Sequence, residues 1–314
     1  MRAVGIMVHG GPEALEVVDV PAVEAGPGQV RVRIYAAAVN PTDTMARNGS
    51  RAEMQKKDPP PYIPGMDAAG IVDQVGEGVT TGVQVGDRVM AMVVPKASHG
   101  AYREQIVLDQ RAVVPAPNET THAEACSLPM NGLTARLSLD LLALEPGQSL
   151  AVTGGPGAYG GYVIQLAKTE GLTVIVDAAP KDEALLKELG ADVIVPRNDD
   201  FAGEVRKHFP DGVDGLADGA LLNEAAIPAV KDGGAFTAIR GFKPKEPIRD
   251  ISFSTTWVTR YDCEYEKLDR LRQLADEGKL SLRVAGTVAP ENAPDAHAAL
   301  EAGGSRGRWV ITFD

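Results

Sequence analysis

The chain has 314 residues, more than one hydrophobic core usually holds, so we expect one large domain or two ordinary ones. Its net charge of −12, from 43 acidic and 31 basic residues, argues against a nucleic-acid partner, because affinity for phosphate backbones comes from clustered Lys and Arg. Hydrophobic residues make up 44% and charged residues 24%, and no apolar run reaches the roughly 18 residues of a membrane span, so we expect no membrane partner.

The first 117 residues consist of short alternating segments separated by Gly and Pro. In GQVRVRIYAAAVN, Val30, Val32 and Ile34 fall on one face and Arg31 and Arg33 on the other, which is the period of a half-buried strand. Similar runs are AAGIVDQVG, GDRVMAMVV and AYREQIVL. This half of the chain predicts a small, mainly antiparallel barrel or sandwich.

From about Glu119 the pattern changes to alternating strands and helices. The first strand is SLAVT, at residues 149–153, and its helix follows Tyr159. The segments after them are TVIVD, DEALLKELG, DVIV, FAGEVRKHF, VDGLADG, LLNEAAIPAVK and GAFTAIR. Such alternation predicts an α/β domain with a parallel sheet covered on both faces. After a helical stretch, EYEKLDRLRQLADEG, the strand-like segment GRWVITF fits either half of the chain.

A glycine-rich turn, TGGPGAYGGYVIQLAK, joins the first of these strands to its helix. Gly155, Gly157 and Gly160 match G-x-G-x-x-G. In the dinucleotide-binding version, the first glycine makes the tight turn, the second lets backbone approach a pyrophosphate, and the third lets helix and strand pack closely. The helix N-terminus then offers free N–H groups to the negative charge. We therefore predict a dinucleotide site here, with a plain structural turn as the alternative.

The signals for the type of dinucleotide conflict. Asp177 ends the second strand, where an acid holds the ribose 2′-OH of NAD. Lys181 follows closely and Arg197 ends the third strand, and basic residues there suit the 2′-phosphate of NADP. We predict NADP(H), bound by Lys181 and Arg197 with Asp177 turned aside. Solvated surface roles for Asp177 and Lys181 are the alternative.

Seven motifs carry a resemblance to a known family. They are, in order, GGPEALEVVDVP, AAAVNPTDTMARNG, YIPGMDAAGIVDQVGEGV, VGDRVMAMV, GAYREQIVL, LPMNGLTARLSL and LAVTGGPGAYGGYVIQLAK. The chain resembles the medium-chain dehydrogenase/reductase superfamily nearly end to end, and its zinc-free quinone oxidoreductase (zeta-crystallin-like) branch most of all. The resemblance implies a GroES-like, mainly β catalytic domain over residues 1–118, completed by residues 284–314. It implies a Rossmann domain over residues 119–283 and an active-site cleft at their junction.

The resemblance also bears on metal binding. Zinc alcohol dehydrogenases of this superfamily bind catalytic metal through a Cys, a Gly-His-Glu motif and a second Cys. The matching positions here are Asn40, Gly65-Met66-Asp67 and Met130, and Cys126 lies four residues too early for the second thiolate. With two cysteines, five scattered histidines and no C-x-x-C pair, we expect no metal.

A zinc-free site constrains the substrate. Reduction of a ketone generates an alkoxide, whose conjugate acid is about as weak as water, so a metal is normally required to stabilise it. Reduction of a quinone produces a phenolate-like oxygen with a pKa of roughly 10, and an enone delocalises the charge as an enolate. Quinones and activated alkenes are therefore favoured over simple alcohols.

Several contact positions follow from the resemblance. Asn40 matches the asparagine beside nicotinamide and substrate, and Asp43 matches the acid that follows it; an Asx turn before a proline is the alternative for Asn40. Thr134 matches a threonine near the nicotinamide ribose, or serves as a helix N-cap. Gly241 matches backbone at the nicotinamide edge, or ends a strand in an ordinary turn. Arg308 matches a basic residue that reaches the cofactor, or forms a surface salt bridge.

The chain departs from the family at the substrate side. Many members carry a tyrosine shortly after the asparagine motif, where this chain has Thr, Met and Ala. Tyr62 is the nearest other phenol and is assigned to the substrate cleft, although packing beside Pro61 and Pro64 is the favoured alternative for it. The residues that we expect to line a flat apolar cleft, with ordinary core packing as the alternative, are Met45, Met92, Phe242 and Trp257.

The combined interpretation is a zinc-independent, NADPH-dependent oxidoreductase that transfers hydride to a quinone or an α,β-unsaturated carbonyl. The alternatives are an NADP(H)-binding redox sensor or structural protein without turnover and, more remotely, an alcohol dehydrogenase. The segment IRDISFSTTWVTR predicts a sixth strand at the sheet edge, and hence a homodimer, unless a loop covers that edge. The sparse cysteines and an N-terminus without the apolar stretch of a signal peptide predict a cytoplasmic protein.

Overall fold

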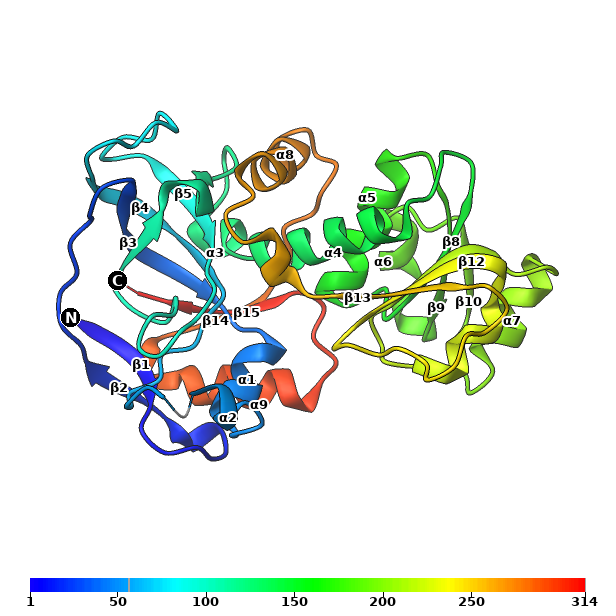
Figure 1. The fold of residues 1–314 in the computed structure, drawn as a ribbon, viewed down its shortest axis with the longest axis horizontal. Coiled ribbons are helices and arrows are strands. Elements are labelled where there is room, and N and C mark those ends of the chain that lie inside the picture. Colours follow the sequence, from blue (N-terminus) through cyan, green and yellow to red (C-terminus); the bar gives the residue numbers. More distant parts are fainter. Residues whose placement is uncertain (56, 314) are drawn as a thin grey trace. The chain divides into compact units, whose positions relative to one another are not determined.

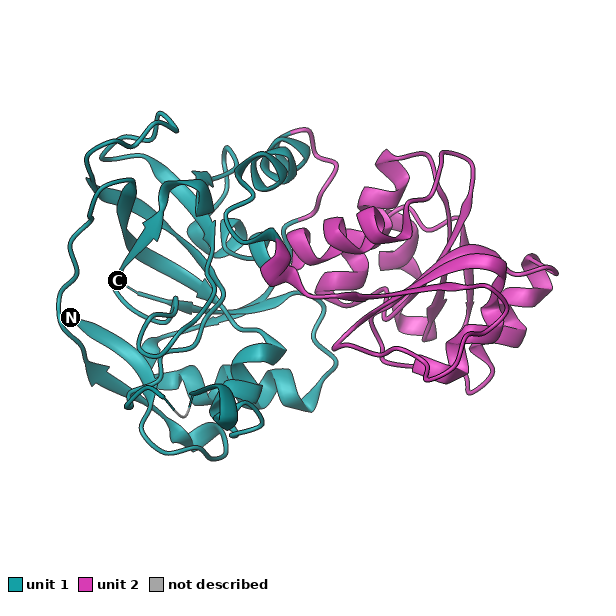
Figure 2. Ribbon diagram, in the orientation of Figure 1, with its two compact units in different colours: residues 1–130, 261–276, 282–314 teal, residues 131–260, 277–281 magenta. Residues whose placement is uncertain are grey.

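The computed structural model describes residues 1–55 and 57–313, which form two compact units (Figure 2). Unit 1 contains residues 1–130, 261–276 and 282–314, and unit 2 contains residues 131–260 and 277–281. Residues 119–130, 261–276 and 282–283 thus belong to unit 1, whereas they were expected in the Rossmann domain. The domain boundaries expected from the sequence remain a prediction.

Unit 1 is built on a seven-stranded sheet in the order β14-β15-β3-β4-β5-β7, with β6 paired to β3 (Figure 1). These strands are β3 (Gln29–Ala38), β4 (Asp67–Val75), β5 (Arg88–Met92), β6 (Gln105–Asp109), β7 (Val113–Pro115), β14 (Val284–Val288) and β15 (Arg308–Thr312). A separate antiparallel pair is formed by β1 (Arg2–Ile6) and β2 (Leu15–Asp19). The helices are α1 (Pro41–Arg47), α2 (Ala52–Gln55), α3 (His122–Ala125), α8 (Tyr265–Asp276) and α9 (Ala293–Ala302).

The strands of unit 1 follow the predicted alternation. In β3 the side chains of Val30, Val32 and Ile34 are buried in the core, whereas Arg31 is half-buried and Arg33 exposed. All pairs in this sheet are antiparallel except β14 with β15. The mainly antiparallel β unit expected from the sequence is confirmed.

The last strand belongs to unit 1. β15 pairs antiparallel with β3, with Val310 opposite Ala38, and Val39 N–H donates to Trp309 O at 2.8 Å. Because β3 leads directly into α1, this pairing brings Arg308 close to Asn40.

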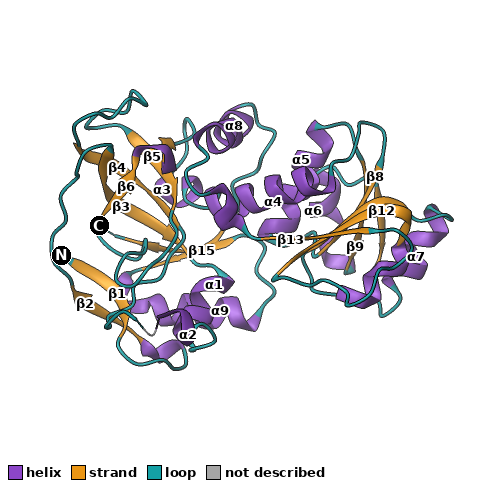
Figure 3. Cartoon of the chain, viewed as in Figure 1, coloured by secondary structure: helices purple, strands orange, loops and turns teal. Residues whose placement is uncertain are grey.

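Unit 2 contains a six-stranded, wholly parallel sheet in the order β10-β9-β8-β11-β12-β13, with helices on both faces (Figure 3). The strands are β8 (Ser149–Thr153), β9 (Thr173–Ala178), β10 (Val193–Pro196), β11 (Val213–Asp218), β12 (Val230–Ile239) and β13 (Ser252–Thr256). The helices are α5 (Ala158–Thr169), α6 (Glu183–Glu188) and α7 (Phe201–His208), and α4 (Pro129–Leu142) leads into the unit. If the six strands are numbered 1 to 6 along the chain, their order across the sheet is 3-2-1-4-5-6. This is the doubly wound arrangement, which binds dinucleotides where the strand order reverses. The predicted Rossmann fold is confirmed.

Two details of unit 2 refine the sequence analysis. The segment LLNEAAIPAVK, expected as an α-helix, is a 3₁₀ helix over Asn223–Ala229, and Pro228 inside it has no N–H for an α-helical bond. The sixth strand, β13, lies at the sheet edge as predicted and pairs within the described chain with β12. None of the helices among the described residues is long and apolar enough to span a membrane.

Candidate cofactor and substrate sites

The glycine turn lies between β8 and α5, with Gly157 as the N-cap of the helix. The left-handed step of the turn falls on Gly154, at φ +71°, and not on Gly155 as the motif assignment expected. Gly155 is required for a different reason. A Cβ there would lie 2.4 Å from Cγ2 of Val176 in β9, so the first glycine of the motif allows turn and strand to pack.

The second and third glycines of the motif differ in what surrounds them. A Cβ on Gly160 would lie 2.4 Å from Gly154 O, so this glycine allows α5 to pack closely on the turn that follows β8. A Cβ on Gly157 would meet one protein atom within 4 Å, Gly154 O at 3.2 Å. The protein's own packing therefore explains Gly155 and Gly160 better than it explains Gly157. As the N-cap of α5, Gly157 lies where the start of a helix favours an approaching anion.

Asp177 and Arg197 form an ion pair at the ends of β9 and β10. The Nε–H of Arg197 donates to Oδ2 of Asp177, and Nη2 donates to the Asp177 carbonyl at 3.4 Å. Asp177 is buried, and its Oδ1 has no hydrogen-bond partner among the described residues. The carboxylate therefore faces Arg197 and keeps one acceptor oxygen for a ligand hydroxyl.

Two cationic side chains, those of Lys181 and Arg197, follow Asp177 in the chain. Lys181 lies in a 3₁₀ turn over Pro180–Asp182, is exposed, and forms no hydrogen bond or ion pair with another described residue. The Arg197 side chain is 43% exposed and lines a pocket of about 530 Å³ with Ala178 and Pro196. Both side chains can therefore reach an anionic ligand.

A second group of polar residues lies in unit 1, around Asn40. Asn40 Nδ2 donates to Oδ2 of Asp67 at 2.9 Å and to Ala38 O at 3.3 Å. Arg308 Nη2 donates to Oδ1 of Asn40 at 2.6 Å and to Oδ2 of Asp67 at 3.1 Å. The side chain of Asn40 therefore joins β4 and β15, and Asn40 is also the N-cap of α1, in a capping box with Asp43.

Burial changes the roles available to these three residues. Asn40 is fully buried and both its amide hydrogens are used, so it has no donor left for a ligand. Arg308 is 4% exposed, and its Nη1 has no hydrogen-bond partner among the described residues. The surface salt bridge considered for Arg308 is therefore wrong, because the pair with Asp67 is buried. Burial raises the pKa of Asp67, and the charge of Arg308 opposes that rise.

Asp43 anchors the start of α1. Its Oδ2 accepts the Asn40 N–H at 2.9 Å and the Tyr102 hydroxyl at 3.0 Å, and its Oδ1 accepts the Gly65 N–H at 3.0 Å. Burial raises the pKa of Asp43 to about 6 against the effect of these three donors. The Asp43 carboxylate thus contacts Asn40 through the backbone N–H of Asn40, and Asp43 is 1% exposed.

The positions matched to zinc ligands carry other chemistry. Met66 Sδ accepts a hydrogen bond from Thr42 Oγ1 at 3.1 Å, and Met130 N–H donates to Asp67 Oδ1 at 2.6 Å. Both methionines are buried. Among residues 1–55 and 57–313, no group of three or more His, Cys, Asp or Glu could hold a metal ion.

Two of the positions expected near the nicotinamide, Thr134 and Gly241, lie in unit 2. Thr134 is inside α4, five residues after its start, so the N-cap alternative is wrong. Its carbonyl accepts the Ser138 hydroxyl at 3.0 Å, and Ser138 Oγ also lies 2.8 Å from the Tyr159 hydroxyl. Gly241 follows β12 at φ +83°, and a Cβ there would lie 2.8 Å from the ring of Trp257, so a side chain is excluded.

The residues expected to line an apolar cleft differ in exposure. Met45 and Phe242 are half-buried, Trp257 is 44% exposed and Met92 is buried. The Tyr62 hydroxyl donates to Asp58 O at 2.9 Å and its ring stacks on His9, which favours the packing role considered for it. The cleft assignment of these residues remains a prediction.

Sequence reasoning missed Asp218. This fully buried carboxylate ends β11 and accepts the Thr153 hydroxyl at 2.6 Å and the N–H groups of Leu222 at 3.1 Å and Asn223 at 2.7 Å. It joins the carboxyl ends of β8 and β11 beside the glycine turn. An acid at the end of a parallel strand was the available signal.

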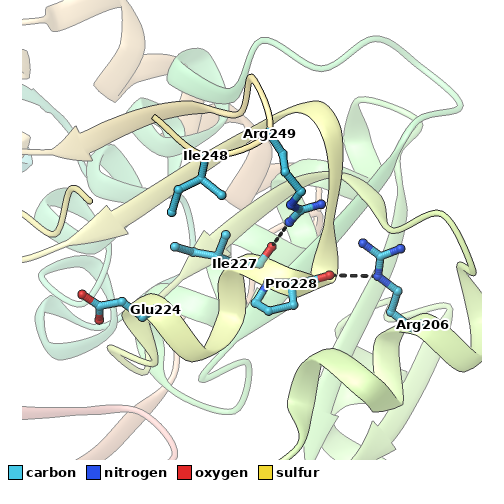
Figure 4. A pocket seen from close by; sticks show the side chains of 6 residues that line it. All are labelled: Arg206, Glu224, Ile227, Pro228, Ile248 and Arg249. Carbon is cyan, nitrogen blue, oxygen red and sulfur yellow. Dashed lines mark hydrogen bonds between the residues drawn. The ribbon is translucent and has the colours of Figure 1, made fainter. Parts of the chain in front are cut away.

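One further pocket of unit 2, of about 550 Å³, contains none of the predicted site residues (Figure 4). Its arginines point at backbone carbonyls: Arg206 Nε donates to Pro228 O at 2.8 Å, and Arg249 Nη2 donates to Ile227 O at 2.9 Å. The two guanidinium groups satisfy carbonyls at the end of the 3₁₀ helix, which accounts for them structurally.

Comparisons with known proteins agree on the fold. A model described as the alcohol dehydrogenase GroES-like domain matches residues 26–118, and one described as zinc-binding dehydrogenase matches residues 189–311. The chain is 31% identical over 293 residues to a 2-methylene-furan-3-one reductase of Solanum lycopersicum, covering 90% of this chain and 71% of that protein.

Two other proteins are similar over most of their length. A chloroplastic NADPH-dependent alkenal/one oxidoreductase of Arabidopsis thaliana is 28% identical over 314 residues, covering 96% of this chain and 77% of that protein. The solved structure of a mycobacterial quinone oxidoreductase superimposes with a TM-score of 0.83 at 27% identity, covering all of both chains.

Proposed function

Because the chain belongs to the medium-chain dehydrogenase/reductase superfamily, in the branch of quinone and alkenal oxidoreductases, we propose that it transfers hydride from NADPH to a quinone or an α,β-unsaturated carbonyl. The observation that carries this proposal is the glycine turn of unit 2. It combines glycines at 155 and 160, where a Cβ would lie 2.4 Å from other atoms of the protein, with the less crowded Gly157, where a Cβ would lie 3.2 Å from Gly154 O. That arrangement fits a pyrophosphate at the start of α5.

The residues at the ends of β9 and β10 fit the phosphorylated ribose of NADPH. Arg197 is fixed by Asp177 with its guanidinium still partly exposed, and Lys181 is exposed and unpaired among the described residues. Both supply charge-assisted donors for a 2′-phosphate. Asp177 Oδ1, buried without a partner, is an acceptor for a ribose hydroxyl. Asp177 is therefore compatible with NADPH because Arg197 neutralises it.

Three further residues would hold the nicotinamide half. Thr134 and Gly241 are assigned to it by the family resemblance, as a ribose contact and a backbone contact. The buried Nη1 of Arg308 is an unused donor, and Asn40 and Asp67 fix its guanidinium. We assign Asn40 to orienting Arg308, since its own amide hydrogens are already bonded.

The chemistry favours an electrophilic acceptor. Bound NADPH supplies the hydride, and one proton from solvent completes the reduction of a quinone to a hydroquinone or of an enone to a saturated carbonyl. The positions matched to zinc ligands, Asn40, Met66 and Met130, offer neither thiolate nor imidazole. The proposed reaction is therefore zinc-independent, and its acceptor must delocalise the negative charge on its own oxygen.

Steady-state oxidation of NADPH, followed by absorbance across a panel of quinones and enones, tests the function. Acceptor-dependent turnover that survives prolonged chelation is the expected result. Tight NADPH binding without turnover would instead support a redox sensor or a structural protein. Oxidation of simple alcohols together with stoichiometric zinc would support an alcohol dehydrogenase.

We also propose a cytoplasmic homodimer. The support for the dimer is the edge position of β13, which pairs on one side only among the described residues, and the exposed Trp257 that follows it, because an unpaired edge with apolar side chains tends to pair with another chain. Light scattering at micromolar concentration is expected to give twice the 33.0 kDa chain mass. A species of 33.0 kDa alone would contradict the dimer.

A further inference from the structure

A buried row of hydrogen bonds links Asp43 to the surface of unit 1. The Tyr102 hydroxyl lies 3.0 Å from Asp43 Oδ2 and 3.1 Å from His297 Nε2. His297 Nδ1 lies 3.3 Å from Arg47 Nη1, and Arg47 Nη2 donates to Glu301 Oε1 at 2.6 Å. Tyr102 and His297 are fully buried and Arg47 nearly so, whereas the Glu301 side chain is 38% exposed.

The donor inventory gives this row one direction. Arg47 can only donate, so Nδ1 of His297 must accept, and the ring proton is on Nε2. That N–H donates to the Tyr102 oxygen, and the single Tyr102 hydrogen donates to Asp43. From Arg47 Nη1 inward, each donor therefore points toward the Asp43 carboxylate, and such aligned bonds strengthen one another.

The charges agree with this direction. Burial and the nearby Arg47 charge lower the pKa of His297 to about 3, so the ring is neutral at physiological pH. Asp43 faces the donors Asn40 N–H, Gly65 N–H and Tyr102, and the like charge of Asp67 adds to the effect of its burial. These donors lower the pKa of Asp43 against the larger effect of burial, so the carboxylate, with a pKa of about 6, is mostly ionised at neutral pH.

The row ends on the residues assigned above to the reaction. Asp43 Oδ2 accepts the Asn40 N–H as well as the Tyr102 hydroxyl, and the Asn40 side chain holds Arg308. A shift of the carboxylate would therefore move the backbone of Asn40 and, through it, the guanidinium of Arg308.

We infer that Tyr102 and His297 are positioning residues for hydride transfer: they fix the Asp43 carboxylate and, through it, Asn40 and Arg308. The inference rests on the proposed function for its effect on turnover. A purely structural role for the two side chains would change stability and leave turnover per folded molecule unaltered.

Three variants test it. Tyr102→Phe removes the donor to Asp43, His297→Leu removes the donor to Tyr102, and His297→Gln retains both an N–H donor and an oxygen acceptor. We expect kcat per folded molecule to fall about tenfold in Tyr102→Phe, the size of one lost hydrogen bond to a charged group. The kcat of His297→Leu should also fall, and the kcat of His297→Gln should lie close to that of the unmodified chain. In the unmodified chain the hydrogen bond from Tyr102 lowers the pKa of Asp43. Its loss in Tyr102→Phe should raise that pKa, so the acid limb of the pH profile of kcat should move to higher pH.

A second readout does not depend on turnover. In protein labelled with ¹⁵N-asparagine, the Asn40 amide resonance should titrate with Asp43, at higher pH in Tyr102→Phe than in the unmodified chain. Unchanged titration and kcat in Tyr102→Phe, or equal losses in His297→Gln and His297→Leu, would overturn the inference. Shifted Asn40 titration in a chain without acceptor-dependent turnover would support the positioning and contradict the proposed function instead.

Discussion

Replacing His297 by glutamine should change how the stability of unit 1 depends on pH. Histidine in an unfolded chain titrates near 6.5, whereas burial and the Arg47 charge lower the pKa of His297 to about 3. Between these values the unfolded chain binds more protons than the folded one. This group therefore lowers stability as the pH falls through that window.

The magnitude follows from the two pKa values. Lowering the pH from 7 to 5 should cost about 2 kcal/mol of unfolding free energy through His297. Asp43 acts in the opposite sense, because its pKa is raised to about 6 from 3.8, so protonation in the folded state restores about 1 kcal/mol over the same range. His297→Gln removes the first effect and keeps the second. As the pH falls from 7 to 5, the unfolding free energy of the variant should therefore rise by about 2 kcal/mol relative to that of the unmodified chain, regardless of how far the two differ at pH 7.

Guanidinium unfolding at several pH values measures this difference. The chain has two tryptophans, and a Trp257→Phe background leaves Trp309 as a reporter within unit 1. His208→Gln, at an exposed histidine of α7, is the matched control for the loss of an imidazole. Identical pH dependence with and without His297 would refute the reasoning, because it would mean that the ring is not held neutral in the folded state.

Two further predictions concern the cofactor. Gly157→Ala should raise the dissociation constant of NADPH at least about tenfold while changing the free energy of unfolding by less than about 1 kcal/mol. Gly155→Ala should instead destabilise the fold by about 1–3 kcal/mol, because its Cβ would lie 2.4 Å from Val176. Calorimetric titration and guanidinium unfolding separate the two, and equal destabilisation would remove the ligand-based explanation of Gly157. Lys181→Ala should raise the dissociation constant of NADPH about tenfold more than that of NADH, since a charge-assisted bond to the 2′-phosphate is lost. Equal effects on both nucleotides would assign Lys181 to the surface alone.

The sequence by itself determined the elements and the type of cofactor turn. The period of two in β3 followed from alternating Val and Arg, and the alternation of strands and helices after residue 119 predicted the doubly wound sheet. The edge position of β13 followed from counting strands. These features depend on neighbours in the chain, where periodicity and glycine chemistry act directly. The 3₁₀ helix at Asn223–Ala229 is the exception, because Pro228 overrides the helical pattern.

The tertiary structure decided which polar groups meet. Arg308 and Asn40 are 268 residues apart in the chain, and Tyr102 and His297 are 195 apart. The family resemblance selected Asn40 and Arg308 separately, but their bond, the buried partner Asp67 and the unused Nη1 appear when β15 pairs with β3. Tyr102 and His297 carried no local signal, since a tyrosine in a loop and a histidine on a helix are usually surface or core residues. Their role comes from burial, because a polar group removed from water must find its partner wherever the fold provides one.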